Sequence, residues 1–452
     1  MSYHAYADTE KAPQLKSPRT APFLGHIPAY VRDPLGFFTE CAETYGDWTP
    51  LRFGSRRAFL ATHPDLIEEV LVARHRSFRK SAGLRRSSIL FGRGLLTSEG
   101  EFWRKQRRLI QPAFHRERVT AAAHTMVEIT ERHLQSWQSG RTFDLHANLM
   151  RLTMAIAVQT LFGMQVREVE TVARALDTGQ QLFTRWMHYV VMLPDWVPTP
   201  RAAGISGAVR DLDRVVYGMI EERRASGEDR GDLLSMLLSL EDADDGERMS
   251  ERQLRDEILT LFLAGHETTA LSLTWTFTLL AQNPDVAERL QEELKTTLRG
   301  RLPSHEDTAR LPYAEKVIRE AMRLYPPAWV VGREALEDVD IGGHAVPKGA
   351  SVIMPQYVVH RDPRFFPNPA RFHPDRWTPD FTRCLPKYAY YPFGGGPRIC
   401  IGSTFAMMES VLLLAAIASR FQLSLAPGYA IVPQPAFTLR PRDGIWMEAT
   451  CR

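Results

Sequence analysis

The sequence from Phe393 to Gly402 is FGGGPRICIG, in which three consecutive glycines and a proline precede Cys400. An apolar run with helical spacing follows from Met407 to Ala418. A glycine-rich loop lets the backbone approach a flat cofactor closely, because glycine has no Cβ. The start of a helix favours negative charge and lowers the pKa of a thiol. The segment therefore predicts a thiolate at Cys400, as in a thiolate bound to iron.

Three other interpretations compete for this segment. A phosphate-binding loop requires Gly-Lys-Ser/Thr after the glycines, whereas Pro397, Arg398 and Ile399 stand there. A buried cysteine without a chemical role is the common case for an isolated cysteine. A catalytic cysteine requires a histidine partner, which a chain with 14 histidines leaves open. The glycines and the cysteine alone do not decide among these.

The composition of the whole chain narrows the class of protein. The 452 residues carry 56 Lys and Arg against 53 Asp and Glu, so no global field favours nucleic acid or an anionic membrane. The cysteines lack paired or metal-type spacing, which indicates reduced thiols in a cytoplasmic protein. The first thirty residues contain no apolar run long enough for a signal peptide or a membrane span. We therefore expect a cytoplasmic protein without a membrane span, and a monomer.

Local signals predict a mainly α fold with a small β region. Ser250 and Gln253 have capping-box spacing, and the apolar run from Ile258 to Ala281 stops at Asn283-Pro284, so a long helix is expected between them. Further helices are expected over 285–298 and from Pro312 to Pro326. Short strands are expected in VDIGGHAV (339–346) and ASVIMP (350–355).

Two units are expected along the chain. Prolines 13, 18, 22 and 28 predict an extended, proline-rich N-terminal segment over residues 1–32. A single domain is expected over residues 33–452, because the motifs in the middle and near the end of the chain point to one site.

The spacing F-x-x-G-x-R-x-C-x-G, made by Phe393, Gly396, Arg398, Cys400 and Gly402, resembles the haem-binding loop of the cytochrome P450 family. The resemblance implies the cytochrome P450 fold, with haem b between this loop and the long helix. It implies that Cys400 is the iron ligand, that Arg398 pairs with a haem propionate, and that Phe393 and Gly402 help to hold the cofactor. Thiolate ligation pushes electron density onto the iron and favours cleavage of the O–O bond.

The motif AGHETT, Ala264 to Thr269, resembles the oxygen-activation motif of the same family. A threonine hydroxyl that bonds to the carbonyl four residues earlier can open a kink that makes room for O₂. The resemblance implies that Thr268 and Glu267 are the catalytic alcohol and acid that relay protons. A zinc site is excluded, because Ala270 stands where a second histidine is required. Close packing of another helix is the alternative explanation for the small residues.

Further motifs are assigned by the same resemblance. Glu320 and Arg323 form E-x-x-R, and FHPDRW (372–377) supplies Arg376; the three are expected to form a buried structural network. Trp103 and Arg107 have the spacing W-x-x-x-R of a propionate-binding helix. Arg333 is expected to be a third propionate partner, in preference to His360.

The resemblance also implies an apolar substrate pocket, with the segment over 181–198 as a mobile lid. The expected lining residues are Ile89, Leu90, Phe91, Leu261, Phe262, Ala264, Ala328, Trp329, Val330 and Phe437. A hydrophobic substrate follows, such as a fatty acid, terpenoid, steroid or polyketide-like molecule.

The expected function is insertion of one oxygen atom from O₂ into that substrate. We expect no flavin or iron–sulfur domain after Cys400, and we therefore expect electrons from NAD(P)H through a ferredoxin or flavodoxin with its reductase. A basic patch is expected to dock that partner and comprises Arg104, Lys105, Arg108, Lys387 and Arg398. Two alternatives remain: a peroxygenase of the same fold that uses H₂O₂, which the retained Glu267 and Thr268 disfavour, and a non-catalytic haem-thiolate sensor.

Overall fold

The structure is a computed structural model that describes residues 16–163, 178–179, 202–239 and 248–452. The predicted lid at 181–198 lies outside the described residues. The main described α-helices are α1 (Ile27–Arg32), α2 (Pro34–Tyr45), α3 (Pro64–Glu68), α4 (Ala82–Arg86), α5 (Ser88–Phe91), α6 (Gly100–Ile110), α7 (Arg116–Leu134), α8 (Leu145–Phe162), α10 (Ala202–Ser226), α11 (Leu233–Ser239), α12 (Glu251–Gln282), α13 (Pro284–Leu298), α14 (His305–Thr308), α15 (Pro312–Leu324), α16 (Gln356–Val359), α17 (Pro379–Cys384) and α18 (Ser403–Arg420).

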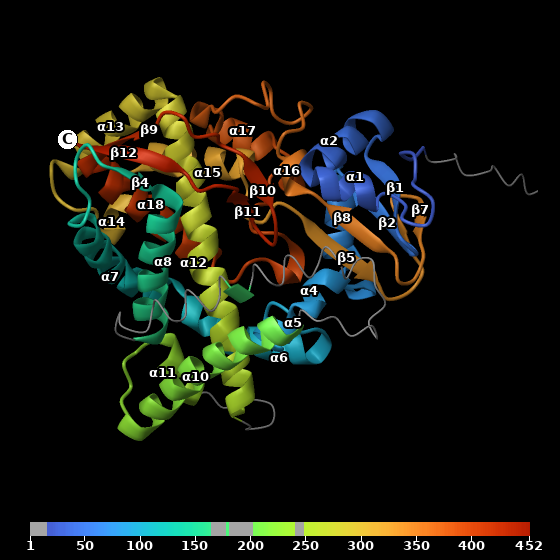
Figure 1. Ribbon diagram of the computed structural model, residues 1–452, viewed down its shortest axis with the longest axis horizontal. Helices are drawn as coiled ribbons and strands as arrows, with labels where there is room; N and C mark the ends of the chain where they lie inside the picture. Colours follow the sequence, from blue (N-terminus) through green and yellow to red (C-terminus); the bar gives the residue numbers. More distant parts are fainter. Residues whose placement is uncertain (1–15, 164–177, 180–201, 240–247) are drawn as a thin grey trace, which may run out of the picture.

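The β-strands are short and gather into small sheets. They are β1 (Trp48–Phe53), β2 (Arg56–Ala61), β3 (Phe78–Lys80), β4 (Thr142–Asp144), β5 (Val331–Ala335), β6 (Val339–Ile341), β7 (His344–Val346), β8 (Ser351–Met354), β9 (Phe421–Leu425), β10 (Pro433–Pro435), β11 (Leu439–Pro441) and β12 (Trp446–Cys451). One sheet has the order β1-β2-β8-β5-β3, another β4-β12-β9, and β6-β7 and β10-β11 are two-stranded. Most helices lie to one side of the five-stranded sheet (Figure 1).

The predicted long helix is α12, which runs through the helical part of the molecule (Figure 1). Its capping box is present: the Ser250 hydroxyl accepts from the Gln253 amide at 3.3 Å, and the Gln253 side chain accepts from the Ser250 amide at 2.7 Å. The helix ends at Gln282, directly before Asn283-Pro284. It packs against α8, α15 and α18, and its residues are buried over most of its length. The sequence signals for this helix are confirmed at both ends.

The N-terminal prediction is wrong in part. Residues Ile27–Arg32, expected to be extended, form helix α1. Pro28 lies in the first turn, where its missing N–H costs no hydrogen bond and its fixed φ suits a helix. Proline density alone therefore does not exclude a helix that starts at the proline.

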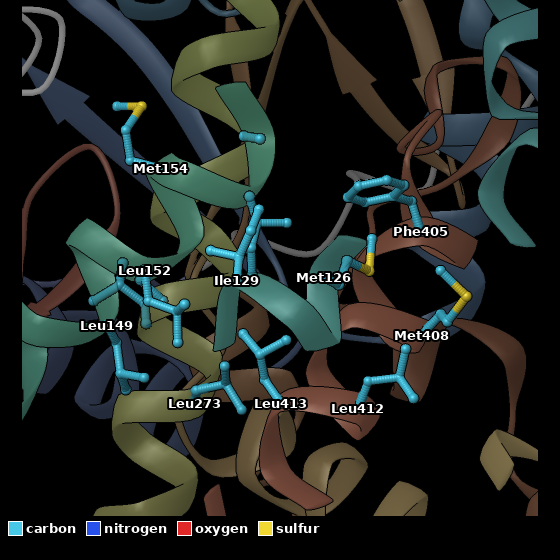
Figure 2. Close-up of a cluster of buried hydrophobic side chains, with 14 of the residues drawn as sticks. Met126, Ile129, Leu149, Leu152, Met154, Leu273, Phe405, Met408, Leu412 and Leu413 are labelled. Atoms are coloured by element: carbon cyan, nitrogen blue, oxygen red, sulfur yellow. The ribbon is translucent and has the colours of Figure 1, made fainter. Parts of the chain in front are cut away.

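Helix α18, which follows Cys400 directly, lies in the main hydrophobic core. Figure 2 shows Phe405, Met408, Leu412 and Leu413 of α18 among side chains of α7, α8 and α12, including Met126 and Leu273. By length and composition α18 could cross a membrane, but 67% of its apolar window is buried inside the protein. This burial fixes the start of α18, and with it the position of the cysteine loop.

Candidate active site

The cysteine loop closes on itself just before α18. The Cys400 amide donates to the Phe393 carbonyl at 3.0 Å, and Gly402 is the residue that caps α18. The side chain of Cys400 is exposed, although the residues that follow it in α18 are largely buried. The loop therefore presents one thiol at a fixed position on the edge of the core.

The prediction of a lowered thiol pKa is wrong for the protein's own groups. The surrounding protein desolvates the thiol and raises the pKa of Cys400 above its ordinary value. A hydrogen bond with the Gly402 backbone and the charge of Arg107 lower the pKa by less than desolvation by the surrounding protein raises it. A positive charge in contact with the sulfur, such as a bound iron would supply, would lower this pKa and favour the thiolate.

Two of the loop glycines serve contacts within the protein. A Cβ on Gly396 would stand 1.9 Å from the Leu71 carbonyl oxygen, and the φ of Gly396 is +65°. A Cβ on Gly395 would stand 2.3 Å from the Tyr388 ring. The glycine run was expected to admit a flat cofactor, but at these two positions it admits a neighbouring backbone and a neighbouring ring.

Gly396→Ala is expected to destabilise the protein by about 2 kcal/mol or more, because the added methyl meets a backbone oxygen and takes an unfavourable φ. Gly394→Ala is the matched control, since Gly394 has a φ of +73° and open space around it. Thermal denaturation and haem content measure both variants. Equal stability of the two variants would contradict the assignment of the Leu71 contact.

A set of cationic side chains surrounds Trp103 beside the loop. The Arg398 guanidinium lies 5.6 Å from the Trp103 ring centroid and donates to Glu99 at 2.5 Å. Arg107 donates to the Ile399 carbonyl at 2.7 Å, one residue before the cysteine. Arg333 is 8% exposed, and burial together with the nearby charge of Arg398 lowers its pKa to about 10. The structure therefore places Trp103, Arg107, Arg333 and Arg398 near the loop.

Lys80 belongs to the same set and was missed from the sequence. Its ammonium group donates to the carbonyls of Leu95 and Ser98, both at 2.8 Å, and lies 5.8 Å from the Trp103 ring centroid. Burial lowers the pKa of Lys80 to about 7. Lys80 belongs to a short strand and its partners to a loop, so no local sequence pattern predicts the contacts between them. A buried concentration of positive charge fits the two carboxylates of haem.

The predicted oxygen-activation motif lies in the middle of α12. The Thr268 hydroxyl donates to the Ala264 carbonyl at 2.8 Å, which is the bond that the motif predicts. Ala264 is exposed within a stretch of otherwise mostly buried residues, whereas a Cβ on Gly265 would contact Leu161 and Ala157 of α8 at 3.6 and 3.7 Å. Close packing against α8 therefore accounts for the glycine at position 265. It does not account for Ala264 and Thr268, which remain candidates for the predicted role in oxygen activation.

Glu267 contacts residues that the sequence did not connect with it. Its carboxylate accepts from the Thr438 hydroxyl at 2.5 Å and from Nε and Nη2 of Arg440, both at 2.6 Å. Glu267 is 1% exposed. The expected acid and alcohol are adjacent in the chain, but their side chains bond to different partners.

The E-x-x-R residues form a buried network. Both carboxylate oxygens of Glu320 accept from Arg323, at 2.8 and 2.9 Å, and Glu320 also accepts from Arg376 and from the Trp377 indole. Arg323 donates further to the carbonyls of His360, Pro369 and Arg371. His360 is fully buried and accepts from the Tyr391 amide at 2.9 Å, so it serves packing of this region.

Among the expected pocket residues, Phe91 and Phe437 lie near each other, whereas Phe262 and Trp329 pack against residues outside the expected pocket. The Phe91 and Phe437 rings lie 6.3 Å apart, which joins the segment before α6 to the β10–β11 hairpin. Phe262 packs on Phe162 with a centroid distance of 4.5 Å, and Trp329 packs near Phe38 and donates to the Ala436 carbonyl. Of the remaining expected residues, Leu90 and Leu261 are buried, Ala328 and Val330 are half-buried, and Ile89 is 55% exposed.

Most residues of the expected docking patch are accessible to solvent, and the patch itself stays a prediction. Arg104, Arg108 and Lys387 are exposed and Lys105 is half-buried, with Arg104 bonded to Glu101 at 2.8 Å. The prediction that Arg398 belongs to this patch is wrong. Its side chain is 18% exposed and paired with Glu99, because Arg398 belongs to the cation set around Trp103.

Comparison with known proteins bears directly on these assignments. Residues 15–446 match the cytochrome P450 family. The chain is 36% identical over 426 residues to cyclooctatin synthase of Streptomyces melanosporofaciens, covering 94% of this chain and 93% of that protein. It is 34% identical over 442 residues to pentalenene oxygenase of Streptomyces avermitilis, covering 96% and 97%.

The fold agrees with a solved structure. The crystal structure of the cytochrome P450DA heme domain superposes with a TM-score of 0.88 at 28% identity, covering 97% of this chain and 98% of that one. The predictions of fold and family are confirmed. This chain therefore belongs to the cytochrome P450 family of haem-dependent, O₂-using monooxygenases.

Proposed function

We propose that Cys400 is the thiolate ligand of haem iron and that Trp103, Arg107, Arg333 and Arg398 hold the haem propionates. The observation that carries the proposal is the exposed thiol of Cys400 beside a largely buried cation set. When bound, haem supplies the iron that activates O₂ for insertion into a C–H bond. Phe393 packs against the core beside this loop and Gly402 caps α18, so both shape the surroundings of the sulfur.

The proposed roles of α12 concern proton movement. The Thr268 hydroxyl holds a proton at the exposed face of the helix, where the Ala264 carbonyl orients it. Glu267 relays protons to this hydroxyl: its carboxylate, once it leaves Arg440, takes up a proton from water and passes that proton on to Thr268.

The proposed substrate is a compact cyclic hydrocarbon of the terpenoid kind. Relatives of this chain are named pentalenene oxygenase and cyclooctat-9-en-7-ol 5-monooxygenase. Phe91 and Phe437 supply aromatic surface, with their ring centroids 6.3 Å apart, and Ala264 is exposed on α12. Leu90, Leu261, Ala328 and Val330 stay in the proposed pocket, Ile89 stays at its rim, and Phe262 and Trp329 are assigned to packing.

The experiment is turnover of pentalenene by the haem-loaded protein with NADPH, ferredoxin and ferredoxin reductase. A spin-shift on titration and a product that contains one added oxygen are expected. Thr268→Ala is expected to lower product formed per NADPH about tenfold or more. Thr276→Ala is the matched control, because its hydroxyl makes the same bond to Ser272 at 2.7 Å farther along α12. Turnover with H₂O₂ alone, or none with any hydrophobic probe, would contradict the proposal.

The proposed electron donor is a separate acidic ferredoxin or flavodoxin that docks on α6. Charge reversal at Arg104 and Lys105 is expected to raise the KM for ferredoxin about three- to tenfold without changing kcat, and less at high salt. Arg57→Glu, an exposed residue of β2, is the control. An unchanged KM would exclude this docking surface.

A further inference from the structure

The segment from Gly92 to Ser98, which joins α5 to α6, is bonded to the first part of α12. The Arg93 amide donates to a carboxyl oxygen of Asp256 at 2.7 Å. The Leu95 amide donates to a carboxyl oxygen of Glu257 at 2.8 Å. Both acidic side chains are buried. Two neighbouring residues of one helix therefore hold two backbone amides of this segment.

The segment approaches α12 this closely because it carries glycine at two positions. A Cβ on Gly92 would stand 1.9 Å from Oδ1 of Asp256. A Cβ on Gly94 would stand 2.4 Å from the Asp256 carbonyl oxygen and 2.2 Å from the Thr260 hydroxyl oxygen. A larger residue at either position would push the segment away from the helix, so the two hydrogen bonds depend on the sequence Gly-Arg-Gly.

Lys80 holds the same segment from the side of the cation set. Its ammonium group donates to the carbonyls of Leu95 and Ser98, both at 2.8 Å. Leu95 is therefore bound through its N–H by Glu257 and through its C=O by Lys80. Contacts on both sides leave the segment little freedom to move.

The segment is continuous with two parts of the proposed pocket. Phe91 directly precedes Gly92, and its ring centroid lies 6.3 Å from that of Phe437. Leu261 follows Glu257 by four residues on α12, so the two side chains lie on the same face of that helix. The bonds between the segment and α12 therefore fix where Phe91 stands relative to the helix.

We propose that Asp256 and Glu257 are positioning residues that hold residues 92–98 as a rigid wall of the substrate pocket and limit the size of the molecules that reach the haem. Each acts through a backbone amide of the wall rather than through the substrate. The inference rests on the proposed pocket around Phe91 and Leu261, and it adds the residues that set the width of that pocket.

The first test measures amide hydrogen exchange in the haem-loaded protein and does not depend on turnover. Asp256→Ala and Glu257→Ala are each expected to speed exchange in the segment roughly tenfold, the factor that one lost hydrogen bond to an ionisable group produces. Asp213→Ala is the matched control, because it removes the other carboxylate bound to Arg255 and leaves the bonds of the segment in place. Unchanged exchange in both of the first two variants would overturn the inference.

The second test measures how tightly imidazole and the bulkier phenylimidazole bind to the haem iron, from the shift of the Soret band. The ratio of the two dissociation constants reports the room beside the iron and needs neither substrate nor redox partner. Asp256→Ala and Glu257→Ala are expected to strengthen binding of phenylimidazole relative to imidazole about tenfold, because the wall can then yield. Asp213→Ala is expected to keep the wild-type ratio.

Glu257→Gln distinguishes a positioning role from a general loss of stability. Burial raises the pKa of Glu257 to about 8, so an uncharged side chain suits the site, and the glutamine carbonyl accepts the same bond from Leu95. This variant is therefore expected to keep the wild-type exchange and the wild-type ratio. Loss of both in Glu257→Gln would overturn the inference.

Glu257→Asp gives the answer should the alanine variants fail to fold. It keeps the carboxyl group but withdraws it from the Leu95 amide, and it is expected to change exchange and ratio as Glu257→Ala does. Faster exchange with an unchanged ratio would show that the segment is not a wall of the pocket and would overturn the inference. A wild-type protein whose Soret band imidazole does not shift would instead count against the proposed haem site, while hydrogen exchange would still decide whether the two acids hold the segment.

Discussion

Glu320→Ala is expected to destabilise the protein by about 3–5 kcal/mol, because it leaves buried cationic donors without their acceptor. Arg323, Arg376 and the Trp377 indole all donate to this carboxylate, and Glu320 is 0% exposed. The total stability of a folded domain is about 5–15 kcal/mol, so the loss is a large fraction. Chemical denaturation followed by circular dichroism and by haem release measures it.

Glu315→Ala is the matched control on the same helix. Glu315 is exposed and lies 4.0 Å from Arg319, so its loss is expected to cost about 0.5 kcal/mol or less. Equal effects of the two substitutions would show that the network around Glu320 does not stabilise the fold.

Cys400→Ser is expected to reduce NADPH-dependent product formation to background, because serine supplies no thiolate to the iron. Cys384→Ser is the matched control, since Cys384 is an exposed free cysteine on α17. Product formation is quantified by mass spectrometry at equal haem content. Retained turnover in Cys400→Ser, or its loss in Cys384→Ser, would contradict the assignment of the ligand.

Much of the helical fold is predictable, because its signals are local. The capping box at Ser250 and the stop at Asn283-Pro284 bound α12 as observed, and the strands around Gly342-Gly343 are present as β6 and β7. Rules based on neighbouring residues fail where one residue type is common in two kinds of structure, as proline is in extended segments and in the first turn of a helix. Pro28 predicts an extended chain, whereas it lies in the first turn of α1.

The site residues that belong to a sequence motif could be predicted. The contacts between segments that lie far apart in the chain could not. The motif predicts Cys400, but the raised pKa of its thiol depends on the protein atoms that the fold brings around the loop. Thr438 stands 171 residues from Glu267 in the chain, so no spacing rule connects them. Lys80 joins the cation set through carbonyls of a loop that carries no sequence signature.

The central claim is that Cys400 binds haem iron as a thiolate. The absorption spectrum of the haem-loaded protein, reduced and exposed to carbon monoxide, tests it most directly. We predict a Soret band at the position shifted by a thiolate ligand, and its disappearance in Cys400→Ser. An unshifted band in the wild-type protein at full haem occupancy, or a shifted band that survives Cys400→Ser, would contradict the account.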